Sequence, residues 1–342
     1  MKKCTMFLFL AIFSFLPAVV FAQRGNMSQG EALEVRLASF MPQNSDWGRC
    51  LDRMSAEWAR VTDNKVELRI IHDGREGSEP KMLSSLSADN IQGALFTSFG
   101  LSNICPSIMT LSVPFCIRND AELNLVLKDI LPLLETQISK TNFFVLAWSI
   151  GGWVNIFSKN PVSVPDDLRS HKMATNPDAQ GINTAFKTMG FHLIETEMTD
   201  MGPKLANGTI NAIYQTPASV APLGLYKNLK NMLDLPIAPF LGALVINRVT
   251  WNKISPADQN RILQATRKIA AEFDSVMPKT VTNAVSMMKK NGLKVNKVTP
   301  AQEQKWRDEV QKAMPPLLGN NTFDPELYEK INEILKRARS GQ

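Results

Sequence analysis

The chain has 342 residues, of which 44% are hydrophobic and 20% are charged, and its formal net charge is +6. This composition is typical of a globular protein and excludes a disordered or fibrous one. The basic residues are scattered rather than clustered, so the sequence gives little support for nucleic-acid binding.

The N-terminus has the features of a secretory signal peptide. Two lysines precede an apolar run from Met6 to Phe21, and the segment 20–22 (VFA) places small residues at the −3 and −1 positions of a cleavage site after Ala22. The run is shorter than the ~20 residues that a membrane-spanning helix needs. Cleavage leaves 320 residues (342 − 22) with a net charge of +4, and we expect a periplasmic location.

A mature chain of this length predicts two domains, at about 150 residues per domain. Its three cysteines are an odd number, so at least one thiol is unpaired. Cys105 and Cys116 can form a disulfide in an oxidising periplasm. The alternative is that both are small buried apolar residues.

The first third of the chain alternates between strand and helix patterns. Residues 34–39 alternate between the two faces of an extended chain and predict a strand. Apolar residues then recur at spacings of 4, 3, 4 and 3 from Trp47 to Val61, which predicts a helix with one apolar face. Further strands are expected at 66–70 and 94–96, with a helix around 82–86 between them. This order indicates parallel α/β units.

The middle of the chain repeats the pattern, and the last third is helical. We expect strands at 143–150, 156–158, 210–214 and 244–246, and a helix at 182–189. A helix start is predicted at Ser255, followed by Pro256 and an early acidic residue. Pro278 should end or kink that helix. If the helix resumes through Lys290, it is long enough to bridge two domains.

Residue patterns for catalysis are absent from the sequence. The three histidines, at positions 72, 171 and 192, are far apart, and no HExxH, GxSxG, P-loop or GxGxxG motif occurs. We therefore expect a non-enzymatic protein without a metal or a cofactor. A secreted enzyme remains a remote alternative, because a fold can assemble a catalytic triad from distant residues.

Short motifs between Phe40 and Pro217 resemble, in order and spacing, those of the solute receptors of tripartite ATP-independent periplasmic (TRAP) transporters, the DctP family. They are FMPQNS at 40–45, EGSE at 76–79, VPF at 113–115 and GTINA at 208–212. The segment 164–176 (VPDDLRSHKMATN) also resembles the P-x-DLKG-x-KIR stretch of that family.

The resemblance implies an α/β fold of two domains that close as a periplasmic-binding-protein clamp (type II-like), with a long domain-bridging helix. We expect domain I at 30–151 plus 240–280, and domain II at 152–239 plus 281–335 with the C-terminal helices. A ligand would bind in the cleft between the domains, and the closed receptor would deliver it to a TRAP membrane permease.

The chain departs from the family pattern at the two positions where arginine grips the carboxylate of the ligand. Ala174 stands at the end of the KIR stretch, and Val154 stands in the G-x-R strand. Neither can form a bidentate guanidinium–carboxylate pair. A buried anion without its partner costs ~3–5 kcal/mol. We therefore expect an apolar or amphipathic ligand.

The alternative is an organic-acid receptor in which a displaced cation or a helix N-terminus meets the charge of the ligand. Arg36, Arg75 and Arg118 are candidate donors whose positions the sequence leaves open. Because both arginines are missing, the chain also resembles the subset of these receptors that works with a tetratricopeptide lipoprotein. This resemblance implies such a lipoprotein as an optional second partner.

The expected ligand-binding residues lie near predicted strand ends or crossing segments, where clefts open in α/β proteins. They are Phe40, Gln43, Trp148, Trp153, Val154, Asn155, Met173, Ala174, Asn176, Tyr214, Gln215, Thr216 and Phe240.

Overall fold

The structure is a computed structural model that describes residues 32–177, 179–320 and 322–341. The expected signal peptide lies outside the described residues. From Ala32 onward the chain forms one compact unit. None of the helices in this part of the chain is both long and apolar enough to cross a membrane.

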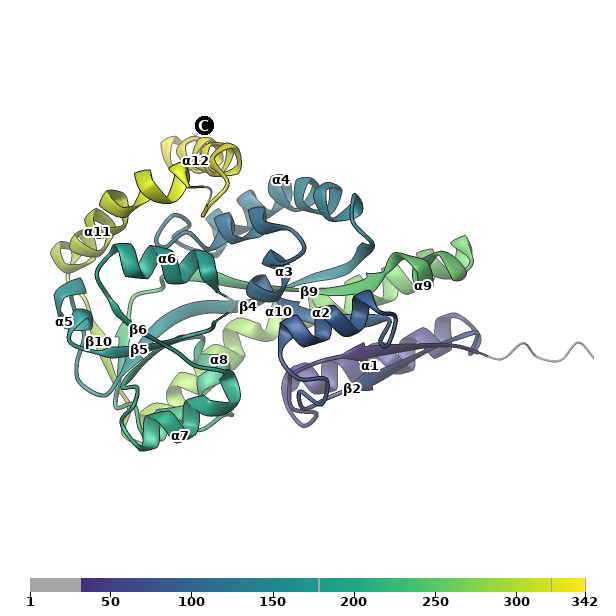
Figure 1. Ribbon diagram of the computed structural model, residues 1–342, viewed down its shortest axis with the longest axis horizontal. Coiled ribbons are helices and arrows are strands. Elements are labelled where there is room, and N and C mark those ends of the chain that lie inside the picture. Colours follow the sequence, from purple (N-terminus) through teal and green to yellow (C-terminus); the bar gives the residue numbers. More distant parts are fainter. Residues whose placement is uncertain (1–31, 178, 321, 342) are drawn as a thin grey trace, which may run out of the picture. The chain divides into compact units, whose positions relative to one another are not determined.

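One mixed sheet organises the fold (Figure 1). Its main order is β2-β1-β3-β9-β4-β7-β5-β6, and β8 pairs with both β4 and β10. The strands are β1 (Leu33–Ala38), β2 (Val66–Ile71), β3 (Gly93–Thr97), β4 (Phe143–Ser158), β5 (Lys172–Thr175), β6 (His192–Glu195), β7 (Ala212–Gln215), β8 (Asn231–Asp234), β9 (Ala238–Asn247) and β10 (Lys294–Lys297).

Two long antiparallel strands, β4 and β9, connect the ends of the sheet. The first part of β4 pairs with β9, and its last residues, 155–158, pair with β7 and β8 instead. Strand β9 also pairs with β3. We call β1–β3 with their helices the first lobe, and β5–β8 with β10 and their helices the second lobe. The expected two-domain α/β clamp fold is confirmed.

Helices cover the sheet on both faces, and α4 lies beside α12 (Figure 1). The α-helices are α1 (Asp46–Val61), α2 (Glu79–Ser87), α3 (Ser98–Ser102), α4 (Asp120–Ser139), α5 (Pro165–Arg169), α6 (Gln180–Thr188), α7 (Met201–Ala206), α8 (Pro217–Val220), α9 (Arg248–Lys253), α10 (Pro256–Lys290), α11 (Pro300–Gly319) and α12 (Pro325–Ser340). The 3₁₀ helices are η1 (Pro106–Ser112), η2 (Met198–Asp200) and η3 (Leu225–Lys227).

The expected bridging helix is α10, which has 35 residues. At ~1.5 Å per residue it extends about 52 Å. The Ser255 side chain accepts a hydrogen bond from the Asp258 amide and so caps the helix start, as the sequence predicts. The helix does not end at Pro278 but continues to Lys290. It packs on α1 and β4, and Gly152 of β4 lies beside Met277 and Val281, on either side of the proline.

The three cysteines of the described chain are free. The Cys105 thiol lies 3.0 Å from the Gln137 side-chain oxygen, and the Cys116 thiol faces Asn332 at 3.8 Å. The two thiols therefore have different neighbours, and the disulfide that the sequence allows does not form here. The alternative interpretation, small apolar residues in the interior, agrees with the burial of Cys105.

Candidate ligand-binding site

The crossing strand β4 and two strands of the second lobe, β5 and β7, bring several expected ligand residues together. Asn155 on β4 lies opposite Gln215 on β7, and Ala174 on β5 lies opposite Ile213 on β7. Because β7 lies between β4 and β5 and runs parallel to β5 and antiparallel to β4, the C-terminal ends of β5 and β7 lie beside residues 154–155 of β4. The sheet register thus places residues 154–155, 174–176 and 214–216 in one region.

Both positions at which the family pattern has arginine are buried and apolar. Val154 is 4% exposed and Ala174 is 2% exposed. Ala174 belongs to an apolar cluster that also contains Phe157, Ile213 and Met201. No guanidinium therefore comes from either position, as the sequence indicates.

Met173 and Tyr214 contribute apolar packing in the same region. Met173 is completely buried in the largest apolar cluster, and the Tyr214 ring packs edge-on against Phe186 with centroids 5.2 Å apart. Burial raises the pKa of Tyr214 above its ordinary value. The phenol is therefore neutral, and its hydroxyl is able to donate a hydrogen bond to a ligand.

The two tryptophans on β4 are engaged by α4. The Trp148 indole N–H donates to Glu135 at 2.8 Å, and the Trp153 indole N–H donates to Asp120 at 2.7 Å. Both rings pack against the largest apolar cluster. Their polar edges are thus occupied within the protein, and the contacts with α4 account for both residues without a ligand.

Asn155 and Thr216 use their side chains to fix the local backbone. The Asn155 amide donates to the carbonyls of Leu233 and Leu235, at 3.1 and 3.3 Å, and so holds the connection between β8 and β9. The Thr216 hydroxyl accepts from the Ser219 amide and caps α8. Gln215 is half-buried, and its side-chain amide has no hydrogen bond within the described residues.

Phe240 lies against a glycine of β4. A Cβ atom on Gly151 would approach the Phe240 ring to 2.5 Å, so only glycine fits there without movement of the ring. Phe40 is half-buried in the first lobe, and its Cβ lies 3.9 Å from the point where a Cβ on Gly74 would stand. Phe240 therefore lies near the crossing of β4 and β9, and Phe40 lies at the end of β1.

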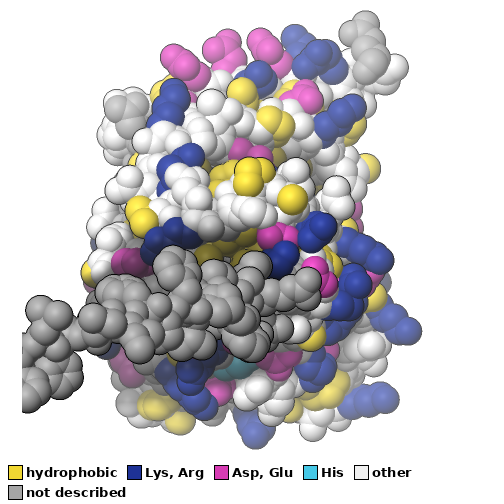
Figure 2. All heavy atoms as spheres, turned by 90° about the vertical axis from the view of Figure 1, so that its right-hand side faces the viewer, with side chains coloured by type: hydrophobic (Ala, Val, Ile, Leu, Met, Phe, Trp, Pro, Cys, Tyr) yellow, Lys and Arg dark blue, Asp and Glu magenta, His cyan; other side chains and the backbone are white. Residues whose placement is uncertain are grey.

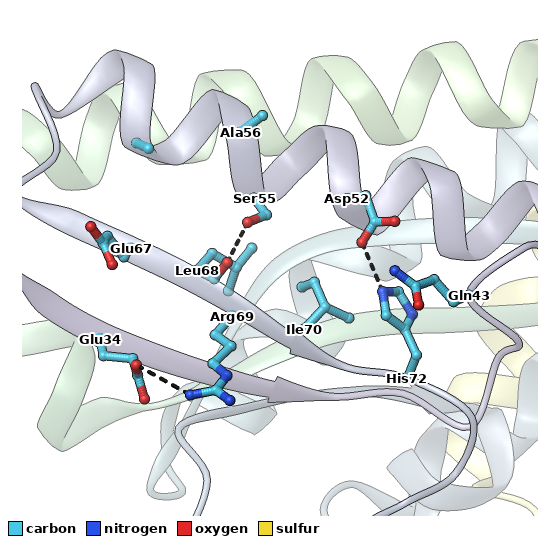
Figure 3. Close-up of a pocket in the computed structure, with 11 residues that line it drawn as sticks. Glu34, Gln43, Asp52, Ser55, Ala56, Glu67, Leu68, Arg69, Ile70 and His72 are labelled. Carbon is cyan, nitrogen blue, oxygen red and sulfur yellow. Dashed lines mark hydrogen bonds and ion pairs between the residues drawn. The ribbon is translucent and has the colours of Figure 1, made fainter.

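Gln43 lies at a separate pocket of about 390 Å³ on the first lobe, between α1 and β2 (Figure 3). His72 and Asp52 meet at this pocket, with 2.7 Å between the His72 Nε2 and a carboxylate oxygen. The other ring nitrogen of His72 is buried without a partner. The pocket contains Gln43 but no other expected ligand residue. No group of three or more His, Cys, Asp or Glu among the described residues is arranged to hold a metal ion.

The N-terminus of α6 follows β5 after four residues, and the sequence had left open which helix N-terminus could meet the charge of a ligand. Asn176 lies between the strand and the helix, and no side-chain cap is formed at Ala179. The first amides of a helix lack partners within the helix and carry a partial positive charge. Alanine at position 179 is not a typical capping residue, so the sequence gives no signal for a helix start there. The helix N-terminus comes near the expected ligand residues only because β5 pairs with β7.

The three candidate cations differ in their surroundings. The guanidinium of Arg36 donates to the carbonyl of Asn90, and Arg75 pairs with Asp73 at 3.5 Å. Arg118 has no ion pair within the described chain, and it lines a second pocket beside α11. On the face in Figure 2, basic side chains are spread among acidic ones, as expected from their scatter along the sequence.

A family model described as "Bacterial extracellular solute-binding protein, family 7", DctP, matches residues 37–317. The chain belongs to the DctP family. Among curated relatives, this DctP protein is 24% identical over 268 residues to the 2,3-diketo-L-gulonate-binding periplasmic protein YiaO of Escherichia coli, with 77% of each chain covered. It is 21% identical over 292 residues to a solute-binding protein of Chromohalobacter salexigens, with 84% of each covered.

Solved structures show the same fold. One is a TRAP periplasmic solute-binding protein of Chromohalobacter salexigens with bound D-glucuronate. It matches the present chain with a TM-score of 0.82 and 18% identity, over 88% of the present chain and 99% of the other. Another, from Sulfurospirillum deleyianum with bound succinate, has a TM-score of 0.81 and 16% identity, over 89% and 100%. DctP-family members are periplasmic solute receptors of TRAP transporters and are not enzymes.

Proposed function

We propose that this DctP protein captures a small organic acid between its lobes and delivers it to a TRAP-type membrane permease. The observation that carries the proposal is that proteins with this fold are described with bound D-glucuronate, beta-D-galacturonate or succinate, all of which are carboxylates. This reverses the ranking of ligand classes expected from Ala174 and Val154. The carboxylate alternative becomes the main proposal.

The N-terminus of α6 is the proposed site for the carboxylate. It follows directly after β5, beside the edge that carries Asn176 and Gln215. A helix N-terminus stabilises an anion by ~0.3–1 kcal/mol, and by up to about 2 kcal/mol when partly buried. This is less than a guanidinium pair supplies, so we expect weaker carboxylate binding than in relatives that retain the arginines.

Titration calorimetry with succinate and D-glucuronate tests this site through Gln180, the exposed first residue of α6. In Gln180→Glu, the added charge suits the helix but repels a bound carboxylate. Like charges ~4 Å apart in water cost about 1 kcal/mol, which corresponds to roughly fivefold weaker binding. Gln180→Ala is the matched control and should bind as the wild type does.

Binding that weakens in Gln180→Glu and persists in Gln180→Ala supports the proposed site. Equal affinities in both variants would place the carboxylate elsewhere. If the wild-type protein binds neither acid, the organic-acid proposal fails.

An apolar or amphipathic ligand is the second candidate, because Val154 and Ala174 are both buried and apolar. Each buried methylene contributes ~0.8 kcal/mol, so a chain of about eight provides roughly 6 kcal/mol before the cost of ordering. Solvent extraction of the purified protein followed by mass spectrometry should then recover such a molecule. Extracts without one, from a protein that binds succinate, would remove this candidate.

The partners and boundaries expected from the sequence remain proposals. The permease, and a tetratricopeptide lipoprotein as an optional second partner, can be tested by co-purification from membranes of the native host. N-terminal sequencing of the exported protein tests cleavage after Ala22. The proposed boundaries, 30–151 with 240–280 and 152–239 with 281–335, fall within the crossing strands and α10. Limited proteolysis tests them.

A further inference from the structure

A pocket of about 480 Å³ lies beside the connection between β8 and β9. Its walls come from three separate segments, which are residues 115–118 before α4, residues 234–236 before β9, and the first turns of α11 with Val298. Arg118, one of the three candidate cations, lines it, whereas none of the ligand-binding residues expected near strand ends does. It is therefore a different place from the edge formed by β4, β5 and β7.

Arg118 brings an unpaired positive charge to this pocket. Within the described chain, its guanidinium has no ion pair and no hydrogen bond. Its pKa is lowered, first by partial desolvation and then by the charges of Arg339 and Arg307. The nearby carboxylates of Glu122 and Glu303 do not outweigh these effects. Arg118 therefore lies among two arginines and two glutamates.

The two neighbouring arginines already have partners. Arg307 binds Glu303 and donates to the carbonyl of Phe115 at 3.0 Å. Arg339 binds Glu122 through two nitrogens, at 2.9 and 2.8 Å. The carboxylates of Glu303 and Glu122 are thus engaged, and Arg118 is left without one. The pocket wall also carries one exposed acidic residue, Asp234.

Two residues of the pocket wall, Pro236 and Val298, present apolar surface near Arg118. Ile117 and Leu235 lie behind them and are only 1% and 5% exposed. A cation next to a small apolar surface suits an anion that carries a short hydrocarbon chain, because the head group and the chain find separate partners. The volume also lies within the range of small-molecule sites, ~300–1,000 Å³.

The pocket wall contains a strained residue that its neighbours hold in place. Phe115 has a φ of 59°, in the left-handed region that non-glycine residues rarely adopt. Its amide donates to the Ile237 carbonyl at 2.7 Å, and its carbonyl accepts from Arg307. Such strain persists where surrounding contacts fix it, often at ligand sites.

We propose that this pocket is a second binding site, in which Arg118 holds an aliphatic carboxylate whose chain lies against Pro236 and Val298. The site does not depend on the proposed transport function. Its walls come from segments that the sequence assigns to both domains, so its occupant would contact both.

Titration with octanoate, and with octanol as the uncharged match, tests the proposal. Trp306 lies 6.1 Å from the Phe115 ring and provides a fluorescence signal, and calorimetry gives the affinity. We expect saturable octanoate binding that is tighter than octanol binding. A hydrogen bond to a charged group contributes ~1.5–3 kcal/mol, so Arg118→Gln should weaken octanoate by about tenfold or more. Arg118→Lys should retain part of the affinity.

Arg75→Gln is the matched control, since Arg75 is also exposed but lies in the first lobe and pairs with Asp73. Gln180→Glu separates the two sites, because it should leave octanoate binding at Arg118 unchanged. Equal octanoate affinity in Arg118→Gln and the wild type would overturn the proposal. So would equal affinity for octanoate and octanol, or the absence of saturable binding.

Discussion

The Asp274 carboxylate on α10 accepts a hydrogen bond of 2.6 Å from the Ser149 hydroxyl on β4. The same oxygen accepts from the Ile150 amide at 3.0 Å. The long helix is thereby joined to the crossing strand by a partly buried acid. Burial raises the pKa of Asp274 above its ordinary value, even though both hydrogen bonds act to lower it.

This link should make part of the stability depend on pH. Because the folded-state pKa of Asp274 is raised, its contribution is fully present below the unfolded-state value of ~3.9 and is lost as pH rises through the folded pKa. Asp274→Asn lacks this titration, so it should gain stability relative to the wild type between pH 4 and pH 7. Urea unfolding at pH 4 and at pH 7 measures the free energy of unfolding of both proteins. A variant whose stability falls relative to the wild type from pH 4 to pH 7 would contradict the prediction.

The contact between Gly151 and Phe240 should limit substitution of β4. In Gly151→Ala, the new methyl group would meet the Phe240 ring at 2.5 Å, so the ring must move. Overpacking of this kind costs ~1–3 kcal/mol in unfolding free energy. The double variant with Phe240→Leu should recover part of the loss. Gly202→Ala on α7 is the control, because nothing lies within 4 Å of that position.

A buried hydrogen bond between α1 and α10 should contribute to stability. The Trp58 indole N–H donates to the Thr266 hydroxyl at 2.8 Å, and both side chains are buried. Thr266→Val keeps the shape but leaves the indole unsatisfied, at a cost of ~1–3 kcal/mol. Thr282→Val on the same helix is the matched control, because that exposed hydroxyl bonds only to the Pro278 carbonyl. Similar losses of unfolding free energy in both variants would contradict the assignment.

The cysteines should be unreactive in the folded protein. Burial raises the pKa of the Cys50 thiol to about 11 and that of Cys116 to about 12, and it also raises that of Cys105. Thiolates are the reactive form, so labelling with a disulfide reagent at pH 8 should be slow until denaturant is added. Mass spectrometry should then find three labels on the mature chain. Detection of a Cys105–Cys116 disulfide would contradict the structure.

Several elements were predictable because their signals are local. The apolar spacing from Trp47 to Val61 became α1, and the Ser255 cap became the start of α10. Strand 156–158 was expected as a separate element, but it is the end of the continuous β4. From the sequence, the glycine pair at 151–152 suggests that one strand ends and another begins there. In the structure the pair lies within β4, where the pairing with β9 becomes irregular after Ile150.

The sequence alone determined the family, because the order of the motifs is read directly from the chain. It also determined that both arginines are missing, because residues 154 and 174 are valine and alanine. Only the tertiary structure decided which side chains meet. It directed Trp148 and Trp153 toward α4, placed Ala174 in an apolar cluster and left Arg118 unpaired beside α11. The same holds for β9, which returns between β3 and β4 and so pairs residues far apart in sequence, a pairing that no local pattern encodes.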